Sequence, residues 1–441
     1  MTDNTSSSIF ATQFRNSAPY INAFRGRSFV IVFSGEALKA NDFDTLAHDF
    51  ALLQSLGIKL VLVFGARPQI DARLQQLGLK TQLHKNVRVT DETALQCVKE
   101  VVGSVRTEIE ALLSMGLTNS PMAGARLRVT SGNFVTAKPY GIRDGIDYMY
   151  TGEIRRIDAS AINRQLDDGA IVLLSPLGYS PTGEIFNVTA ESVATATAME
   201  LNAHKLIYLT EGLDITDPQG KVIHELSVQD ALQLSQTKSE LSEDIQHILA
   251  SAIQVCQYGV KRVHIINRKL QGALLQELFT RDGIGTLIST DRYEGTRSAG
   301  IDDVPGLLEL IKPLEQQGVL VRRSRERLET EIDKFIVVER DGMIVACAAL
   351  YVFENCSTAE LACLVVHPDY RMQSRGENLL HYIESIALQK NLQQIFVLST
   401  QTSHWFKERG FLESTPENLP VEKKLLYNYQ RNSKVFIKQL A

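Results

Sequence analysis

The strongest fold signal in this chain is the stretch ELACLVVHPDYRMQSRGE at residues 360–377. Residues 361–366 form an apolar run long enough for a buried strand. Pro368 fixes the backbone and lacks an N–H donor, so it predicts a turn. Apolar residues then recur at helical spacing from 379 to 387. The pattern predicts a strand, a basic loop and a helix whose N-terminal N–H groups suit a pyrophosphate.

Composition predicts a soluble protein of two or three domains. The chain has 441 residues, of which 44% are hydrophobic and 22% charged. Its formal net charge of −5 gives no basic field for nucleic acid or a membrane surface. No apolar run has the length of a signal peptide or a transmembrane helix, so we expect a cytoplasmic protein.

The five cysteines are scattered and include no C-x-x-C pair. This spacing supports neither a zinc site nor a disulfide framework, and we expect no metal. Cys347 and Cys363 lie in apolar surroundings, which is typical of small core residues in a reducing compartment.

The first 290 residues alternate strands with helices. Apolar, β-rich runs at 28–33 and 59–64 are followed by helical patterns, the first at 43–56. Further strands are predicted at 127–129, 171–174, 206–209 and 263–266. Such alternation predicts an α/β domain with an open, mainly parallel sheet covered on both faces.

A helix is predicted before the first strand. Apolar residues from Ile9 to Phe24 are spaced for one helical face, interrupted by Pro19. The helix has no sheet partner in the sequence. It either packs on its own domain or mediates contact with another subunit.

Four stretches of this half resemble the amino-acid kinase fold, in its N-acetylglutamate kinase branch. They are VFGARPQI (63–70), NVRVTD (86–91), NVTAE (187–191) and KLIYLTEG (205–212). The resemblance covers roughly residues 20 to 290, a domain-sized span.

The kinase chemistry is nevertheless predicted to be lost. Val32 stands where working kinases of this branch have a lysine, and valine cannot stabilise charge on a transferring phosphoryl group. No second phosphate-binding lysine is evident at 235–243. We therefore expect a kinase-like domain that does not phosphorylate.

The second half resembles the GNAT-type N-acetyltransferases. The family's acetyl-CoA loop has the pattern Q/R-x-x-G-x-G/A, and RMQSRG at 371–376 matches it at both ends, with Ser374 in place of the middle glycine. The loop alone fits an ordinary turn equally well. Helices at 304–314 and 325–332, strands at 335–338, 344–351 and 395–398, and HWFKERGF at 404–411 agree with the family's order.

A kinase-like domain joined to a GNAT domain resembles the long bacterial form of the N-acetylglutamate synthase family. The resemblance implies an N-terminal helix (1–25), a kinase-like regulatory domain (26–290), a linker (291–300) and a GNAT α+β acetyltransferase domain (301–441). It also implies transfer of acetyl from acetyl-CoA to L-glutamate, the first step of arginine biosynthesis, in a homohexamer.

The same resemblance implies site residues. Glu360 is the predicted base, and Ser399 the polar group near the amine or thiolate; either could instead be an ordinary strand-end residue. The predicted acetyl-CoA contacts are Leu364, Val365, Val366, Arg371, Met372, Gln373, Ser374, Arg375 and Gly376.

Glutamate has two carboxylates, so its site requires cations. The predicted substrate contacts are Arg322, Cys363, Lys424 and Arg431. The kinase-like domain is expected to bind L-arginine as an inhibitor, with Glu294, Gly295 and Arg297 as predicted contacts, because relatives place that stretch beside the effector.

Two alternatives remain open. The chain could be a non-catalytic arginine-sensing scaffold, against which the near-complete acetyl-CoA loop argues. It could also be a bifunctional synthase and kinase, against which Val32 argues.

Overall fold

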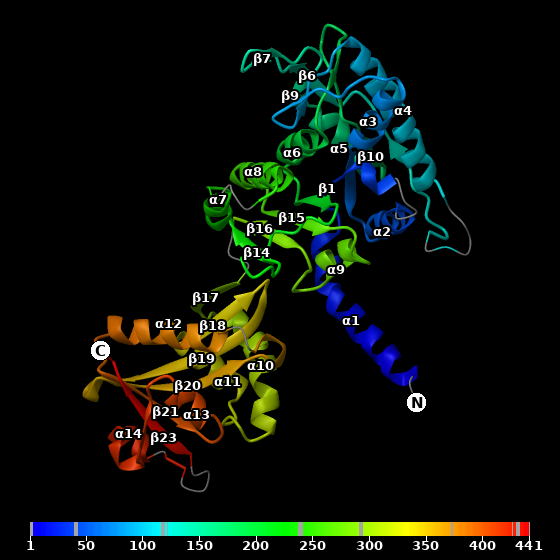
Figure 1. The fold of residues 1–441 in the computed structure, drawn as a ribbon. Coiled ribbons are helices and arrows are strands. Elements are labelled where there is room, and N and C mark those ends of the chain that lie inside the picture. The colour runs from blue at the N-terminus through cyan, green and yellow to red at the C-terminus, as the bar shows by residue number, and fades with distance from the viewer. Residues whose placement is uncertain are drawn as a thin grey trace. The chain divides into compact units, whose positions relative to one another are not determined.

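The computed structural model describes residues 3–38, 43–115, 120, 122–236, 241–290, 294–371, 374–425, 427–428 and 433–440. The chain divides into two compact units, Met1–Asp291 and Arg292–Ala441 (Figure 1). Each unit has its own sheet and its own hydrophobic cores. None of the helices in the described ranges combines the length and apolar character that a membrane crossing requires.

The first unit is built on a mainly parallel sheet. Its strands are β1 (Ser28–Phe33), β2 (Lys59–Phe64), β5 (Val129–Thr130), β10 (Ile171–Leu174), β13 (Lys205–Thr210), β14 (Glu225–Ser227), β15 (Arg262–Asn267) and β16 (Thr286–Ser289). They lie in the order β14-β16-β15-β13-β1-β2-β10-β5, and only the β15–β16 pair is antiparallel among the described pairings. The predicted open, mainly parallel sheet is confirmed.

Helices cover both faces of this sheet. They are α2 (Phe43–Ser55), α3 (Arg67–Gln76), α4 (Glu92–Leu113), α5 (Ala159–Asp167), α6 (Ala190–Glu200), α7 (Val228–Gln236), α8 (Glu243–Gln257) and α9 (Ala273–Phe279), with a 3-10 turn η1 (Gly35–Leu38). A second sheet has the order β12 (Ile185–Asn187), β11 (Leu177–Tyr179), β6 (Val135–Pro139) and β9 (Gly152–Ile157), and the short hairpins are β3 (Leu83–His84) with β4 (Val87–Arg88) and β7 (Ile142–Arg143) with β8 (Ile146–Asp147).

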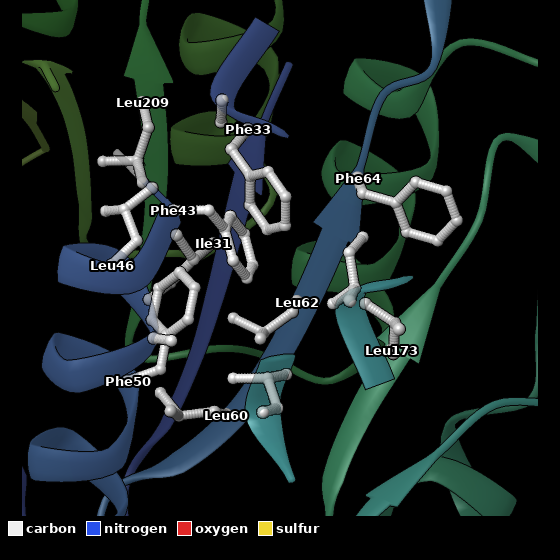
Figure 2. Packing of buried hydrophobic residues seen from close by; sticks show 14 of the residues in the cluster. Ile31, Phe33, Phe43, Leu46, Phe50, Leu60, Leu62, Phe64, Leu173 and Leu209 are labelled. Carbon is white, nitrogen blue, oxygen red and sulfur yellow. The ribbon is translucent and has the colours of Figure 1, made fainter. Parts of the chain in front are cut away.

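Strand β1 shows why the sequence folds this way. Successive side chains of a strand point to opposite faces, and both faces are covered here, so the run is apolar throughout. Ile31 and Phe33 enter one core with Phe50 of α2, as Figure 2 shows, whereas Val32 enters the core on the other face. Truncating a buried phenylalanine such as Phe50 to alanine costs about 3–5 kcal/mol.

Helix α1 (Asp3–Phe24) precedes β1. The helix continues through Pro19, so the predicted interruption was wrong. Its last residue, Phe24, is buried against Phe29 and Phe279, with ring centroids 5.2 and 5.9 Å away. This packing compensates the hydrogen bond that proline cannot donate.

A buried chain of polar groups joins the sheet to α9. Lys205 Nζ lies 2.8 Å from His264 Nε2, and His264 Nδ1 lies 2.6 Å from Glu277 Oε1. Burial lowers the pKa of His264 to about 4, so the neutral ring donates from Nδ1 to Glu277 and accepts from Lys205. Burial opposes ionisation of Glu277, but hydrogen bonds from His264 and two backbone N–H groups lower its pKa to about 2. These hydrogen bonds from Lys205 through His264 to Glu277 hold α9 against the sheet.

The second unit has a mostly antiparallel sheet. Its strands are β17 (Glu294–Ser298), β18 (Phe335–Arg340), β19 (Met343–Phe353), β20 (Thr358–Val366), β21 (Gln394–Ser399), β22 (Leu412–Ser414) and β23 (Lys434–Gln439), in the order β17-β18-β19-β20-β21-β23-β22. Its helices are α10 (Val304–Gln316), α11 (Arg325–Thr330), α12 (Arg375–Gln389), α13 (Ser403–Lys407) and α14 (Val421–Leu425), with 3-10 turns η2 (Ile301–Asp303), η3 (Ile332–Lys334), η4 (Glu354–Cys356), η5 (Pro368–Tyr370) and η6 (Pro416–Asn418). Separate cores lie on the two faces, one containing residues of α10 and the other residues of α12.

The segment predicted as a linker, 291–300, contains an ordered strand. Residues 294–298 form β17, which pairs antiparallel with β18 from Glu294–Arg340 to Ser298–Ile336. The polar composition suggested a solvated linker. Ion pairs hold these polar side chains on an edge strand instead, which only the partner strand and loop could reveal.

Candidate active site

The site begins where two parallel strands separate. Strands β20 and β21 pair only between Thr358–Glu360 and Gln394–Phe396. Beyond Glu360, β20 continues beside β19 while β21 continues beside β23. The strand edge from 361 to 366 that faces β21 is therefore not paired with it. A gap of this kind offers backbone N–H and C=O groups to an extended ligand.

Strand β20 also carries a bulge. Its register with β19 passes from Ala349–Ala362 to Cys347–Val365, so Cys363 and Leu364 oppose the single residue Ala348. Cys363 adopts a left-handed backbone with φ of 53°. A bulge turns backbone groups out of the ladder, and here it does so beside the gap.

The predicted acetyl-CoA loop follows β20. Ser374 is the N-cap of α12 with φ of 55°, and Arg375 is the first helical residue. The N–H groups of the first helical turn have no partner within the helix, an arrangement that suits an anion. Gly376 lies under Trp405 and Val366. Arg371 is exposed and its Nε donates to the Val366 carbonyl at 3.4 Å, whereas Met372 and Gln373 lie outside the described residues.

The guanidinium of Arg375 is held by other groups of the second unit. Arg375 is 7% exposed, and its Nε and Nη2 donate to the two Glu294 oxygens at 2.7 and 2.8 Å. Its Nη1 donates to the Tyr370 carbonyl at 3.2 Å. Arg375 can therefore contact a pyrophosphate through its backbone N–H, not its guanidinium.

The predicted base, Glu360, lies at the start of the gap and is 7% exposed. Its Oε2 forms an ion pair with Lys423 of α14 at 2.7 Å. Tyr351 lies directly opposite Glu360 on β19, so both side chains point to the same face of the sheet. Burial and the Glu331 carboxylate, which accepts from the tyrosine hydroxyl at 2.7 Å, raise the pKa of Tyr351 to about 12.

The second predicted catalytic residue, Ser399, ends β21 on the other side of the gap. It is 8% exposed, and its Oγ accepts from the Thr402 N–H at 3.1 Å and lies 2.9 Å from Thr402 Oγ1. These contacts start α13, so the ordinary turn role holds, and the hydroxyl still lies at the strand end where the gap opens.

Two of the predicted substrate contacts, Arg322 and Lys424, are adjacent in the sequence to cations that lie beside Glu360, Tyr351 or Cys363. Arg322 is exposed, whereas the half-buried Arg323 lies beside Tyr351 and Cys363. Lys424 is exposed, whereas its neighbour Lys423 contacts Glu360. Arg323 and Lys423 thus lie beside residues of this face, because neighbouring positions point in different directions that the local backbone determines. Substrate contacts by Arg322 and Lys424 stay predictions. Arg431 lies outside the described residues.

The predicted effector residues lie on β17, in the second unit. The Glu294 oxygens accept from Arg375 and, at 3.0 Å, from Arg340. Arg297 forms ion pairs with Asp303 and Glu339, each at 2.6 Å. Gly295 lies between them and pairs with Glu339. Glu294 thus holds guanidinium groups of its own unit, and its contact with a free arginine stays a prediction.

In the first unit, the carboxyl ends of β1, β13 and β15 are joined by a salt bridge. Arg268 donates to both oxygens of Glu211 at 2.6 Å, and Ser34 donates to Glu211 at 2.7 Å. Val32 is buried in β1 and is 3% exposed. A phosphoryl group at this edge would find an arginine that already has a carboxylate partner. Within the described residues, no group of three or more His, Cys, Asp or Glu could hold a metal ion.

Comparisons with known proteins agree with this architecture. The model of the amino acid kinase family matches residues 27–267, and the model of the acetyltransferase (GNAT) domain matches residues 331–413. An amino-acid acetyltransferase of Azotobacter vinelandii is 54% identical over 98% of this chain and 99% of that protein. The chain belongs to the amino-acid acetyltransferase family. A relative of the same name from Ectopseudomonas mendocina is 52% identical over the same shares of the two chains.

Solved structures extend the match within the family. The N-acetylglutamate synthase of Neisseria gonorrhoeae, complexed with coenzyme A and L-arginine, has a TM-score of 0.89 and 38% identity over 98% of this chain and 99% of that chain. The same enzyme complexed with coenzyme A and N-acetyl-glutamate has a TM-score of 0.63 and 39% identity over the same shares. The predicted family, fold class and acyltransferase activity are confirmed.

Proposed function

We propose that this acyltransferase transfers acetyl from acetyl-CoA to the α-amine of L-glutamate, giving N-acetyl-L-glutamate and CoA. The observation that carries the proposal is the gap between β20 and β21, which has an acid at one end and a helix N-terminus at the other. The gonococcal enzyme complexed with coenzyme A and N-acetyl-glutamate supports the same pair of ligands.

Acetyl-CoA binds along β20. The backbone of Leu364, Val365 and Val366 pairs with the pantetheine arm, and the first turn of α12 receives the pyrophosphate. Arg371, exposed at the start of the loop, adds a charge-assisted phosphate contact. Ser374 and Gly376 are proposed as loop contacts through their backbone, and contacts by Met372 and Gln373, which lie outside the described residues, stay predictions.

The chemistry follows from this arrangement. Glu360 takes a proton from the glutamate ammonium, directly or through water, and the freed amine attacks the thioester carbon. The oxyanion that develops is stabilised by N–H groups beside the bulge at Cys363. When the carbon–sulfur bond breaks, Ser399 supplies a hydrogen bond to the leaving thiolate, and the second proton that the attacking nitrogen loses passes to this thiolate or to water.

Substrate carboxylates are bound by cations on the Glu360 face. We propose Arg323, rather than its exposed neighbour Arg322, as a carboxylate contact, because it is half-buried beside Tyr351 and Cys363. Lys423 is a further candidate on α14, and Lys424 and Arg431 stay predictions.

We also propose that the reaction is the first step of arginine biosynthesis and that L-arginine binds the kinase-like unit and inhibits. The gonococcal enzyme has been captured with L-arginine. A domain with a kinase fold, Val32 in its first strand and Arg268 neutralised by Glu211 is suited to regulation rather than phosphoryl transfer.

Self-association through α1 completes the proposal. Phe10 and Phe14 are 68% and 61% exposed and stack with ring centroids 6.0 Å apart. Exposed aromatic pairs are typical of protein interfaces, and a homohexamer is the predicted assembly. All five cysteines are free, which agrees with a cytoplasmic location.

Thiol release from acetyl-CoA with a panel of amino acids tests the activity. We expect turnover with L-glutamate and much less with aspartate, glutamine or ornithine. Release with other amines but not glutamate would disprove the substrate assignment. Arginine titrations of the same assay, and ADP measurement with ATP and N-acetylglutamate, test the inhibition and the loss of kinase activity.

A further inference from the structure

A partly buried cluster of three charged residues links the start of the second unit to the predicted acetyl-CoA loop. Glu294 opens β17, three residues after the boundary at Asp291. Its carboxylate accepts two hydrogen bonds from Arg375 at 2.7 and 2.8 Å and one from Arg340 at 3.0 Å. The side chains of Arg375 and Arg340 are only 7% and 11% exposed.

The side-chain contacts of Arg375 constrain the backbone at the start of α12. Arg375 is the first residue of α12 and follows Ser374, whose left-handed φ of 55° costs about 1–2 kcal/mol. The same guanidinium donates to the Tyr370 carbonyl at 3.2 Å, on the other side of the loop. One side chain therefore ties both ends of the loop to Glu294.

Neighbouring charges keep the Glu294 carboxylate ionised and paired with Arg375. Burial alone would raise the pKa of Glu294, but hydrogen bonds and charge from Arg375 and then Arg340 lower it below its ordinary value. The carboxylate is therefore ionised at pH 7. A two-bond fork between carboxylate and guanidinium fixes direction as well as distance.

We propose that Glu294 is a positioning residue for acetyl-CoA. It holds the Arg375 side chain inward, so that the backbone N–H groups at the start of α12 face the pyrophosphate. The inference rests on the proposed acetyl-CoA role of this loop. Glu294 belongs to the first strand after the boundary between the units. A displacement of this strand would therefore move Arg375 directly, through the Glu294–Arg375 ion pair.

The matched control lies on the same pair of strands. Glu339 of β18 pairs with Arg297 of β17 at 2.6 Å, but that pair is more exposed and includes no residue of the loop. Glu339→Gln removes a similar charge from the same sheet edge without touching Arg375.

The experiment measures CoA binding by calorimetry and the KM values for both substrates in full-length variants. Glu294→Gln is expected to weaken CoA about tenfold and raise the acetyl-CoA KM similarly, since a charge-assisted fork is lost. The glutamate KM should stay within about twofold. Glu339→Gln should change neither constant, and Glu294→Asp, which keeps the charge, should recover part of the affinity.

Further measurements separate positioning from general damage. In a double-mutant cycle, adding Arg375→Gln to Glu294→Gln should weaken CoA little further, because the two residues act as one unit. A CoA affinity within twofold of wild type in both Glu294→Gln and Glu294→Asp would overturn the proposal, as would equal rises in the KM of both substrates. If Arg371→Ala also leaves CoA affinity unchanged, the acetyl-CoA role of the loop is disproved. If Arg371→Ala lowers CoA affinity but the Glu294 variants do not, only the positioning role of Glu294 is disproved.

Discussion

The two units differ in what happens to polar groups where the strands of the sheet end or separate. In the first unit, the carboxyl ends of β1, β13 and β15 are bridged by Arg268 and Glu211, which satisfy each other. In the second unit, β20 and β21 separate after Glu360, so part of the β20 edge is not paired with its neighbour. Polar groups that satisfy one another stabilise the fold, whereas backbone groups without a strand partner remain available to a ligand.

The largest expected effect is on kcat, for a substitution of Glu360 at the start of the gap between β20 and β21. Glu360→Gln should lower kcat about 10²–10⁴-fold, because the amide cannot take the ammonium proton. The acetyl-CoA KM should change little. Initial rates over a range of acetyl-CoA concentrations, at saturating glutamate, measure both constants.

A matched control for this variant is Glu384→Gln. Glu384 pairs with Lys438 at 2.6 Å, much as Glu360 pairs with Lys423 at 2.7 Å, but away from the gap. Its kcat should be that of wild type. A kcat for Glu360→Gln within threefold of this control would remove Glu360 from the mechanism.

The second prediction concerns the salt bridge between Arg268 and Glu211 in the first unit. Arg268→Met removes the guanidinium that binds Glu211 and should destabilise the first unit by about 3–5 kcal/mol. The double variant Glu211→Gln/Arg268→Met should recover much of this loss, since no charge is left behind. Denaturant unfolding measures the difference. Equal stability of the single variant and wild type would show that the bridge has no structural role.

The third prediction distinguishes two adjacent arginines. Arg323→Gln should raise the glutamate KM about 10- to 100-fold, the loss of one charged hydrogen bond of about 1.5–3 kcal/mol. Arg322→Gln should leave it within about twofold, because that side chain is exposed. The reverse result would restore the choice made from sequence.

The smallest effect concerns Ser374. Ser374→Gly relieves the left-handed backbone but increases the entropy of the unfolded chain, so stability should rise by less than about 1 kcal/mol. The acetyl-CoA KM should not change. Ser385→Gly, within α12, should instead lower the melting temperature slightly. A fall in stability for Ser374→Gly would contradict the strain argument.

Sequence periodicity predicted the elements closely, because burial patterns are local. The predicted strands 59–64 and 171–174 have the observed bounds, and the helix at 304–314 lacks only two residues of α10. Ion pairs between distant positions were not predictable. Glu294 and Arg375 are separated by 81 residues, and no local pattern shows that they meet.

The sequence alone indicated the kinase-like and GNAT domains and the order of many of their elements, and it predicted an acetyl-CoA loop at 371–376 and a missing kinase lysine at Val32. Each of these depends on residue type at a position, or on a period that one segment carries. The tertiary structure alone decided that β20 and β21 separate after Glu360, that Lys423 pairs with Glu360 and Arg323 lies beside Tyr351, and that Glu294 binds Arg375. These features depend on side-chain direction and on contacts between remote segments, which the packing of the whole unit determines.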